Sequence, residues 1–284
     1  MQSAYLRAGR FELALSRPLV MGILNVTPDS FSDGGRFDTL DAALAHARQL
    51  VDEGADILDI GGESTRPGAA QVDEEEELRR VMPVLRELVS WGVPLSIDTR
   101  RTAVMRAAIE AGVDLVNDIA ALEAPGALAT VADSQVAVCL MHKQGNPQDM
   151  QQAPHYDEVV TEVGDYLAAR RAEALEAGIA QGRLLLDPGF GFGKTFEHNV
   201  TLFKGMRRLS QRWATPMLIG VSRKSMLGQM LGNRPSPERD AASVAAALLA
   251  VQQGAAIVRV HAVGPTVDAL TVWRTLDAAS STTE

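Results

Sequence analysis

Short apolar runs recur along the chain, and segments that carry polar residues separate each run from the next. The runs are rich in Val, Ile and Leu and do not alternate cleanly between polar and apolar residues, which is typical of strands buried on both faces. The eight runs are residues 19–26, 57–60, 94–97, 115–116, 136–141, 184–186, 217–221 and 256–260. The pattern therefore predicts eight buried strands with connecting segments between them.

Helical spacing is clearest in two of the connecting segments. In residues 40–51 the apolar positions recur with a period near 3.6, at Leu40, Ala43, Leu44, Ala47 and Leu50. Residues 74–89 begin with four glutamates, and acidic residues at a helix start complement the helix dipole. A solvated helix start explains these glutamates better than an acidic interaction patch does. Both segments are predicted to be helices, the second ending before Trp91-Gly92.

Eight strands that alternate with helices over 284 residues predict a (β/α)₈ barrel, the TIM-barrel fold, at about 35 residues per unit. The phrases GADILDI, GVDLVND and GAAIVRV each place a glycine just before a strand, so they mark short turns between helix and strand. Residues 5–15 alternate around Ala8-Gly9-Arg10 and predict a small N-terminal β-hairpin that closes the bottom of the barrel. We expect one domain over residues 1–284, with the hairpin in 1–17 and the barrel in 18–280. A doubly wound open sheet is the alternative architecture.

Composition narrows the functional classes. The chain has 27 Lys and Arg against 36 Asp and Glu, a net charge of −9, whereas a general nucleic-acid binder needs a basic surface. Apolar residues make up 46%, enough for a globular core. No run approaches about 18 apolar residues and the N-terminal segment has no continuous apolar centre, so we expect no membrane span, no secretory signal and a cytoplasmic location. The one cysteine, Cys139, lies in an apolar run and is predicted to be a buried, unreactive thiol.

Polar residues follow the predicted strands at the end where barrel enzymes place their active site. They are Asn25 and Asp29 in the first connection, which also contains Phe31, then residues 61–67 in the second, Asp98, Asn117-Asp118, His142, Asp187, Ser222-Arg223-Lys224, and Arg259 with His261. A single aspartate at such a position often caps the following helix, so for Asp98 and Asp118 both interpretations stay open. Together these residues predict a polar mouth at one end of the barrel.

Arg259 and His261 stand two residues apart in the last run, so in a strand their side chains face the same way. An inward arginine is costly unless it meets an anion, and barrels often bind phosphate beside the last strand. The pair therefore predicts an anion site, with Lys224 as a second partner. The sequence lacks HExxH and paired CxxC motifs, so a hard cation would be held mainly by ligand phosphates, with oxygens from the region of Asn25 and Asp29.

Residues 189–195 read G-F-G-F-G-K-T and look like a nucleotide-binding loop. A Walker loop needs four residues between its first glycine and the Gly-Lys pair, whereas Gly189 and Gly193 enclose three. The dinucleotide fingerprint also fails, because the third glycine comes one residue early. We predict instead a flexible glycine-rich loop that presents Phe190 and Phe192 to a flat ligand.

At these same positions the sequence resembles the dihydropteroate synthase family. The matching strings are GILNVTPDSFSDGG (22–35), GGESTRPGA (61–69), SIDT (96–99), ND (117–118), MHKQGNP (141–147), LDPGFGFGK (186–194), GVSRKSM (220–226) and RVH (259–261). The resemblance implies that 6-hydroxymethyl-7,8-dihydropterin diphosphate and p-aminobenzoate give 7,8-dihydropteroate and diphosphate, with Mg²⁺ as cofactor. It also implies a homodimer and competition by sulfonamides.

The resemblance further implies roles for the matching residues. Asn25 coordinates Mg²⁺, and Arg259 and His261 hold the diphosphate together with Thr65. The pterin pocket is implied to consist of Asp98, Asn117, Met141, Asp187, Gly220 and Lys224. The p-aminobenzoate pocket is implied to consist of Phe31, Thr65, Arg66, Pro67, Phe192 and Ser222. The residues expected to act in catalysis are Asn25, Asp98, Asp187, Lys224, Arg259 and His261.

Two positions depart from the family pattern. Ala262 follows RVH where the family often has Asp, and Arg100-Arg101 follow SIDT where a shorter polar residue and Lys are common. We expect neither departure to touch the assigned residues. Two other functions stay open, a pterin-dependent methyltransferase and a catalytically silent pterin-binding paralogue. A methyltransferase has no need for diphosphate anchors, so Lys224 and Arg259 with His261 favour the synthase.

Overall fold

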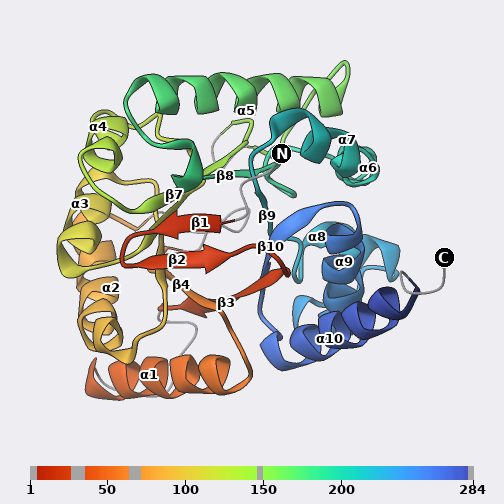
Figure 1. The fold of residues 1–284 in the computed structure, drawn as a ribbon. Coiled ribbons are helices and arrows are strands. Elements are labelled where there is room, and N and C mark those ends of the chain that lie inside the picture. The colour runs from red at the N-terminus through yellow and green to blue at the C-terminus, as the bar shows by residue number, and fades with distance from the viewer. Residues whose placement is uncertain (1–4, 27–35, 64–71, 146–149, 281–284) are drawn as a thin grey trace.

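The computed structural model describes residues 5–26, 36–63, 72–145 and 150–280. Within them, eight parallel strands close into a barrel in the order β10-β3-β4-β5-β6-β7-β8-β9, and helices surround it (Figure 1). β10 pairs with β3 in parallel, with Ile257 opposite Leu19, and this pairing closes the sheet. The predicted TIM barrel is confirmed, and the alternative of an open doubly wound sheet is wrong.

Each predicted apolar run lies in one barrel strand, and the boundaries differ by two residues or fewer. The barrel strands are β3 (Leu19–Asn25), β4 (Ile57–Gly61), β5 (Leu95–Asp98), β6 (Leu115–Asp118), β7 (Ala137–Met141), β8 (Leu184–Asp187), β9 (Met217–Ile219) and β10 (Ala255–Val260). The helices are α1 (Arg36–Asp52), α2 (Glu74–Leu88), α3 (Thr102–Ala111), α4 (Ala127–Ala132), α5 (Val159–Glu176), α6 (Phe196–Lys204), α7 (Met206–Trp213), α8 (Ser225–Met230), α9 (Asp240–Gln252) and α10 (Val263–Ser280). Short 3₁₀ turns are η2 (Val89–Trp91), η3 (Gln181–Arg183) and η4 (Ser236–Glu238).

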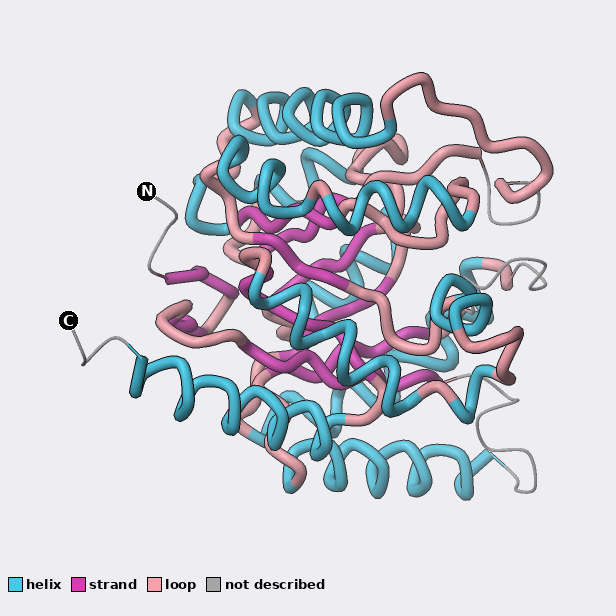
Figure 2. Tube along the Cα trace, turned by 90° about the vertical axis from the view of Figure 1, so that its right-hand side faces the viewer, coloured by secondary structure: helices cyan, strands magenta, loops and turns pink. Residues whose placement is uncertain are grey.

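An antiparallel hairpin of β1 (Tyr5–Ala8) and β2 (Phe11–Ala14) lies across one end of the barrel (Figure 2). Leu6 and Ala8 are buried against the inward-facing residues of the barrel's lower half. At the turn, the Arg10 guanidinium donates to both oxygens of the buried Asp114, at 2.9 and 2.8 Å. The prediction that the hairpin closes the bottom of the barrel is confirmed.

Successive residues of each barrel strand face in turn the helices and the barrel interior. The outward side chains, such as Leu58 and Ile60, belong to the large core beneath the helices. The inward side chains of the lower half form a separate apolar cluster, which includes Met21, Ile57 and Leu185. Nearer the carboxyl ends of the strands the inward positions become polar. The barrel interior is therefore apolar in its lower half and polar at the carboxyl ends of the strands, where it forms the mouth.

The three repeated glycine phrases form the same turn. Gly54, Gly112 and Gly254 lie between a helix and the next strand, with φ of +96°, +99° and +101°. Glycine adopts these angles without the steric cost that a Cβ imposes. The repeats therefore mark the turns into β4, β6 and β10, as predicted.

The helix predictions need one correction. The apolar stripe of α1 packs on the core as expected, with Ala43, Ala47 and Leu50 fully buried. The helix α2 begins after Asp73, whose carboxylate accepts a hydrogen bond from the Glu76 N–H. Of its four glutamates, however, Glu77 is fully buried, so the expectation of a solvated helix start is wrong for that residue.

Two further expectations concern the interior and the helix lengths. Cys139 is fully buried on β7, and burial raises the pKa of its thiol, so it matches the predicted unreactive thiol. Among the described residues, every helix is too short or too polar to cross a membrane.

Candidate active site

Arg259 of β10 lies at the centre of the polar mouth. Its Nε donates to Asp59 Oδ2 at 2.5 Å, and its Nη2 donates to Asp98 Oδ2 at 2.7 Å. Burial disfavours the guanidinium cation, but the two carboxylates outweigh that effect and raise the pKa of Arg259 further above its usual value. The predicted inward arginine is confirmed, and the anions it contacts here are two aspartates of the chain itself.

Asp59 is the site residue that the sequence interpretation missed. It lies in the middle of β4 and is fully buried, and its Oδ2 accepts from both Arg259 and the Asn117 amide, the latter at 3.2 Å. Its Oδ1 and the hydroxyl of Ser96, its register partner on β5, lack hydrogen-bond partners among the described residues. The carboxylate inside the apolar run ILDIG could have identified Asp59 as a site residue, because a buried charge in a strand requires a partner.

Asp98 and Asn25 lie on either side of Gly61. A Cβ placed on Gly61 would be 3.6 Å from Asp98 Cβ and 3.8 Å from Asn25 Oδ1, so the absent side chain leaves room between the two groups. Burial raises the pKa of the Asp98 carboxyl to about 7, an effect that Arg259 opposes and Asp59 reinforces. The mouth therefore holds a carboxyl group that titrates near neutral pH.

On the opposite side of the mouth, Asp187 lies at the end of β8. Its Oδ1 accepts a hydrogen bond from the Gly189 N–H at 2.7 Å, and burial raises its pKa to about 6. A Cβ on Gly220 would lie 3.9 Å from both Asp187 Oδ2 and Arg259 Cδ, so the glycine keeps a space open between β8 and β10. The Lys224 ammonium lies 4.1 Å from the centre of the Phe192 ring. Asp187 and Gly220 thus border one space, and their assignment, with Lys224, to a pterin pocket stays a prediction.

Phe192 and Met141 form the apolar wall of this space with Ile119 and Met150. Phe190, in contrast, packs into the core beneath the helices, with its ring 5.7 Å from that of Phe203. The prediction that both phenylalanines face a ligand is therefore wrong for Phe190, and for Phe192 it stays a prediction.

His261 and Ser222 form a pair at the edge of the mouth. The Ser222 hydroxyl lies 2.9 Å from His261 Nδ1 and also accepts from the His261 N–H at 3.2 Å. The strand β10 ends at Val260, so Ser222, rather than strand alternation, orients the His261 ring. The two residues, assigned to different subsites on the sequence, share one hydrogen-bonded unit.

The contacts of Asp118 decide between the two interpretations left open for it, a local backbone cap or a site residue. Its two carboxylate oxygens accept from the Ala120 and Leu122 N–H groups, both at 2.7 Å. Ala121 and Leu122 have positive φ values of +49° and +61°, and these bonds hold that unfavourable backbone in place. Asp118 therefore organises the turn after β6, whereas Asn117 and Asp98 contribute to the mouth itself.

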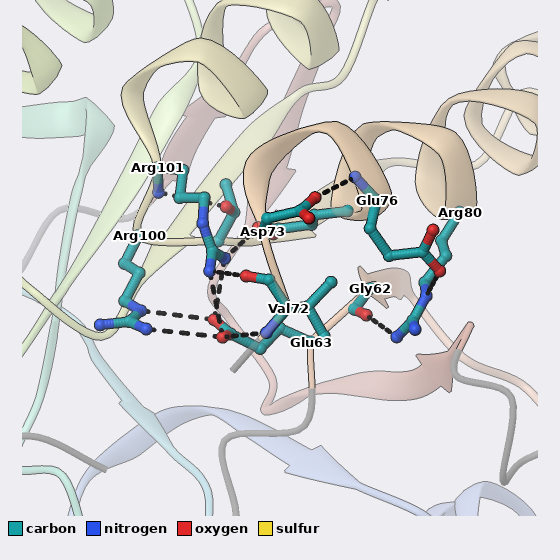
Figure 3. A network of polar contacts seen from close by, with 10 residues as sticks. Gly62, Glu63, Val72, Asp73, Glu76, Arg80, Arg100 and Arg101 are labelled. Carbon is teal, nitrogen blue, oxygen red and sulfur yellow. Dashed lines mark hydrogen bonds and ion pairs between the residues drawn. The ribbon is translucent and has the colours of Figure 1, made fainter. Parts of the chain in front are cut away.

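A charged network ties together residues that flank the second connection (Figure 3). Arg100 and Arg101 both point toward Glu63, and Arg101 also pairs with the buried Glu77 and the Val72 carbonyl. The Glu63 carboxylate in turn accepts from the Val72 N–H at 3.3 Å. As expected, neither arginine touches an assigned residue within the described chain. Phe31, Thr65, Arg66 and Pro67 lie outside the described residues, as do Thr27 to Ser30.

The charges of the mouth bear on cofactor binding. Among the described residues, the carboxylates of Asp59, Asp98 and Asp187 offset much of the positive charge of Arg259, Lys224 and the nearby Lys194. In the part of the chain that the structure describes, no cluster of three or more His, Cys, Asp or Glu side chains is arranged to hold a metal. The residues present fit a hard cation bound mostly by ligand oxygens and water, with the Asn25 amide oxygen as a single protein donor.

Comparisons with known proteins find relatives that match nearly the whole chain. The sequence profile of a family described as pterin binding enzymes matches residues 21–261. The chain is 55% identical to dihydropteroate synthase of Neisseria meningitidis serogroup C over 95% of this chain and 96% of that protein. The structure of Xanthomonas albilineans dihydropteroate synthase with 4-aminobenzoic acid has a TM-score of 0.92 and 54% identity, over 98% and 99% of the two chains. That of Burkholderia cenocepacia dihydropteroate synthase with 7,8-dihydropteroate has a TM-score of 0.91 and 51% identity, over 99% of each chain.

Proposed function

Because the chain belongs to the dihydropteroate synthase family of pterin-binding enzymes, we propose that the polar mouth of its barrel binds the two substrates of that reaction. The enzyme is a transferase of folate biosynthesis that condenses 6-hydroxymethyl-7,8-dihydropterin diphosphate with p-aminobenzoate to give 7,8-dihydropteroate and diphosphate. The observation that carries the assignment of the site is the set of polar side chains at the ends of five barrel strands, around an open space above Gly61 and Gly220.

We propose that the pterin ring binds between Asp187 and Asn117. A carboxylate accepts hydrogen bonds from an amino group and a ring N–H together, which suits Asp187 Oδ2 beside the open space. Asn117 donates its amide to Asp59, so its carbonyl oxygen remains to accept from the ring. Lys224 donates to ring acceptors, Met141 and Gly220 contact the faces of the ring, and Asp98 lines the same pocket through its pair with Arg259.

The diphosphate is proposed to lie toward Arg259 and His261, with Asn25 at its other side, and resemblance to the family adds Thr65 to this subsite. Because the aspartates offset much of the positive charge there, we propose that Mg²⁺ also binds, and Asn25 would hold it. When bound, this ion stabilises negative charge on the leaving group. Arg259 and His261 donate to the same oxygens, and Asp59 and Ser222 hold those two side chains in place.

The p-aminobenzoate pocket is proposed to contain Phe192 and Ser222, together with Phe31, Thr65, Arg66 and Pro67 by resemblance to the family. The arylamine nitrogen uses its lone pair to form a bond to the pterin methylene carbon as the bond from that carbon to the diphosphate oxygen breaks. The leaving diphosphate takes the bonding electrons, and the nitrogen then loses a proton. An arylamine is neutral near pH 7, so positioning and charge stabilisation suffice without a strong base. Sulfonamides resemble p-aminobenzoate and are expected to compete in this pocket.

We also propose that the enzyme is a homodimer. Large apolar side chains are exposed on the neighbouring helices α9 and α10, with Leu249 at 52%, Val272 at 58% and Leu276 at 66% exposure (Figure 1). Val272 and Leu276 lie four residues apart on the same side of α10, and burial of this side against a second copy would remove them from water.

The reaction is tested by incubating the protein with the pterin diphosphate, Mg²⁺ and p-aminobenzoate and following dihydropteroate and diphosphate by chromatography. We expect both products in equal amounts. Binding of the pterin without either product would indicate the catalytically silent paralogue. Methyl transfer from a methylated pterin cofactor, with no dihydropteroate formed, would indicate the methyltransferase.

A further inference from the structure

Lys194 is a buried lysine for which the proposed reaction has no use. It closes the G-F-G-F-G-K segment after β8, and its side chain is only 2% exposed. Its ammonium lies 2.8 Å from the Gly189 carbonyl, 3.1 Å from the Phe192 carbonyl and 3.0 Å from His142 Nδ1. An ammonium has three N–H donors, and here each has one acceptor.

The third acceptor depends on the charge of His142. Burial and the nearby Lys194 cation lower the pKa of the His142 ring to about 2, so the ring is neutral at physiological pH. A neutral ring whose Nδ1 faces an ammonium accepts the hydrogen bond at that nitrogen and carries its own proton on Nε2. The His142 backbone lies against the same loop, because a Cβ on Gly189 would come within 1.8 Å of the His142 carbonyl oxygen.

The loop that Lys194 binds carries one proposed site residue, Phe192, and hydrogen-bonds another, Asp187. The Gly189 N–H donates to Asp187 Oδ1, and the ring of Phe192 lies under the Lys224 ammonium. Gly189, Gly191 and Gly193 have positive φ values of +69°, +80° and +60°, which explains the alternating glycines as a backbone requirement. The loop is therefore held at its backbone, contrary to the flexible loop predicted from its glycine content.

We propose that Lys194 is a positioning residue whose ammonium clamps the 189–193 turn, so that Asp187 and Phe192 are held in the geometry that binds the pterin. The inference rests on the proposed pterin site. Lys194 touches neither substrate in this account. It acts on Asp187 through the Gly189 backbone and, as a nearby cation, favours the ionised form of that carboxylate.

The charges around both groups give the proposal a pH signature. Burial lowers the pKa of Lys194 to about 7, which Asp187 opposes and Lys224 reinforces. Burial raises the pKa of Asp187 to about 6, which the Gly189 N–H, Lys224, Lys194 and Arg259 oppose. Pterin binding should therefore weaken below about pH 6, where Asp187 is protonated, and above about pH 7, where Lys194 loses the proton that completes the clamp. Asp98 also titrates near pH 7, but its protonation affects binding as the pH falls and not as the pH rises.

The test compares Lys194→Met, which removes charge and donors, with Lys194→Gln, which removes only the charge and keeps an amide donor. Lys204→Met, at the exposed end of α6, is the control. We expect kcat/KM for the pterin diphosphate at pH 7 to fall at least about tenfold in Lys194→Met and less in Lys194→Gln, because the amide still binds the loop carbonyls. In both variants the decline above pH 7 should disappear, and the acid limb should move up by about one pH unit.

A uniform loss at every pH, with no change in the shape of the profile, would overturn the proposal. If the variants do not fold, the wild-type protein supplies the test. It has four lysines, so carbon NMR of its labelled lysine side chains is readily resolved. Lys194 should titrate near pH 7, and its signal should shift when 6-hydroxymethylpterin binds; a Lys194 signal that pterin binding leaves unchanged would overturn the clamp. Failure of the proposed site is distinguishable, because Asp187→Asn would then retain wild-type pterin affinity.

Discussion

The substitution Asp59→Asn isolates the charge of the carboxylate beneath Arg259. Asparagine has the same size, and its amide oxygen can still accept from Arg259 Nε and from the Asn117 amide, as Asp59 Oδ2 does now. Its amide nitrogen would take the place of Oδ1, which has no partner among the described residues, near the Ser96 hydroxyl. The change therefore removes a buried negative charge while leaving the hydrogen-bond geometry available.

The expected loss follows from the strength of that pair. A hydrogen bond to a charged group contributes about 1.5–3 kcal/mol, and the 2.5 Å contact to a fully buried carboxylate belongs to this class. A loss of about 2 kcal/mol corresponds to a roughly 30-fold lower kcat/KM for the pterin diphosphate, because Arg259 is less firmly held. The KM for p-aminobenzoate should change little.

A pH profile supplies an independent readout. The Asp59 charge helps to raise the pKa of Asp98 above its usual range, whereas Arg259 lowers it. Without Asp59, Asp98 becomes the only described carboxylate bonded to Arg259, so its pKa should fall and the acid limb of kcat/KM should move to lower pH. The matched control is Asp56→Asn. Asp56 lies three residues before Asp59, near the bottom of the barrel, and its carboxylate pairs with Arg17. A kcat/KM within threefold of wild type and an unmoved acid limb in Asp59→Asn would show that the Asp59 charge does not hold Arg259 for binding.

Three further predictions test other parts of the structure. Arg101→Ala leaves the buried Glu77 without its arginine partner, so the free energy of unfolding measured with urea should fall by about 3 kcal/mol. The control is Arg79→Ala, at an exposed ion pair, which should change the free energy of unfolding by less than about 1 kcal/mol. Ser222→Ala frees the His261 ring and should raise the KM for the pterin diphosphate several-fold, without lowering pterin affinity in a direct binding assay; unchanged kinetics would show that Ser222 does not orient His261. Val272→Glu on α10 should convert the proposed dimer to a monomer by light scattering, whereas Arg274→Glu should not, and a wild-type protein that is already monomeric would contradict the dimer.

The sequence was sufficient for the barrel because its signals are local and repeated. Apolar runs, helical spacing and the three glycine phrases each report on backbone conformation within a few residues. The mouth residues at strand ends could be located for the same reason, since the end of a strand is visible as the end of an apolar run. Asp59 was missed because it lies within such a run, where the inward and outward positions are not distinguished by composition.

Other errors arose from contacts distant in sequence. Glu77 looks solvated within its glutamate run, and only its contact with Arg101 explains its burial. Phe190 and Phe192 are equivalent in the sequence, but alternate positions of the turn face opposite directions, one into the core and one into the mouth. The glycines suggested flexibility, whereas the buried ammonium of Lys194 holds the loop.

In the proposed function, the mouth cluster around Arg259 binds the leaving diphosphate within an acidic protein. Calorimetry tests this by measuring the binding of the pterin diphosphate and of the pterin alcohol to the wild type and to Arg259→Ala, with Mg²⁺ present. We expect the substitution to remove most of the affinity that the diphosphate adds, while the alcohol binds the two proteins with a much smaller difference. An Arg259→Ala variant that keeps wild-type turnover and the full diphosphate contribution would contradict it.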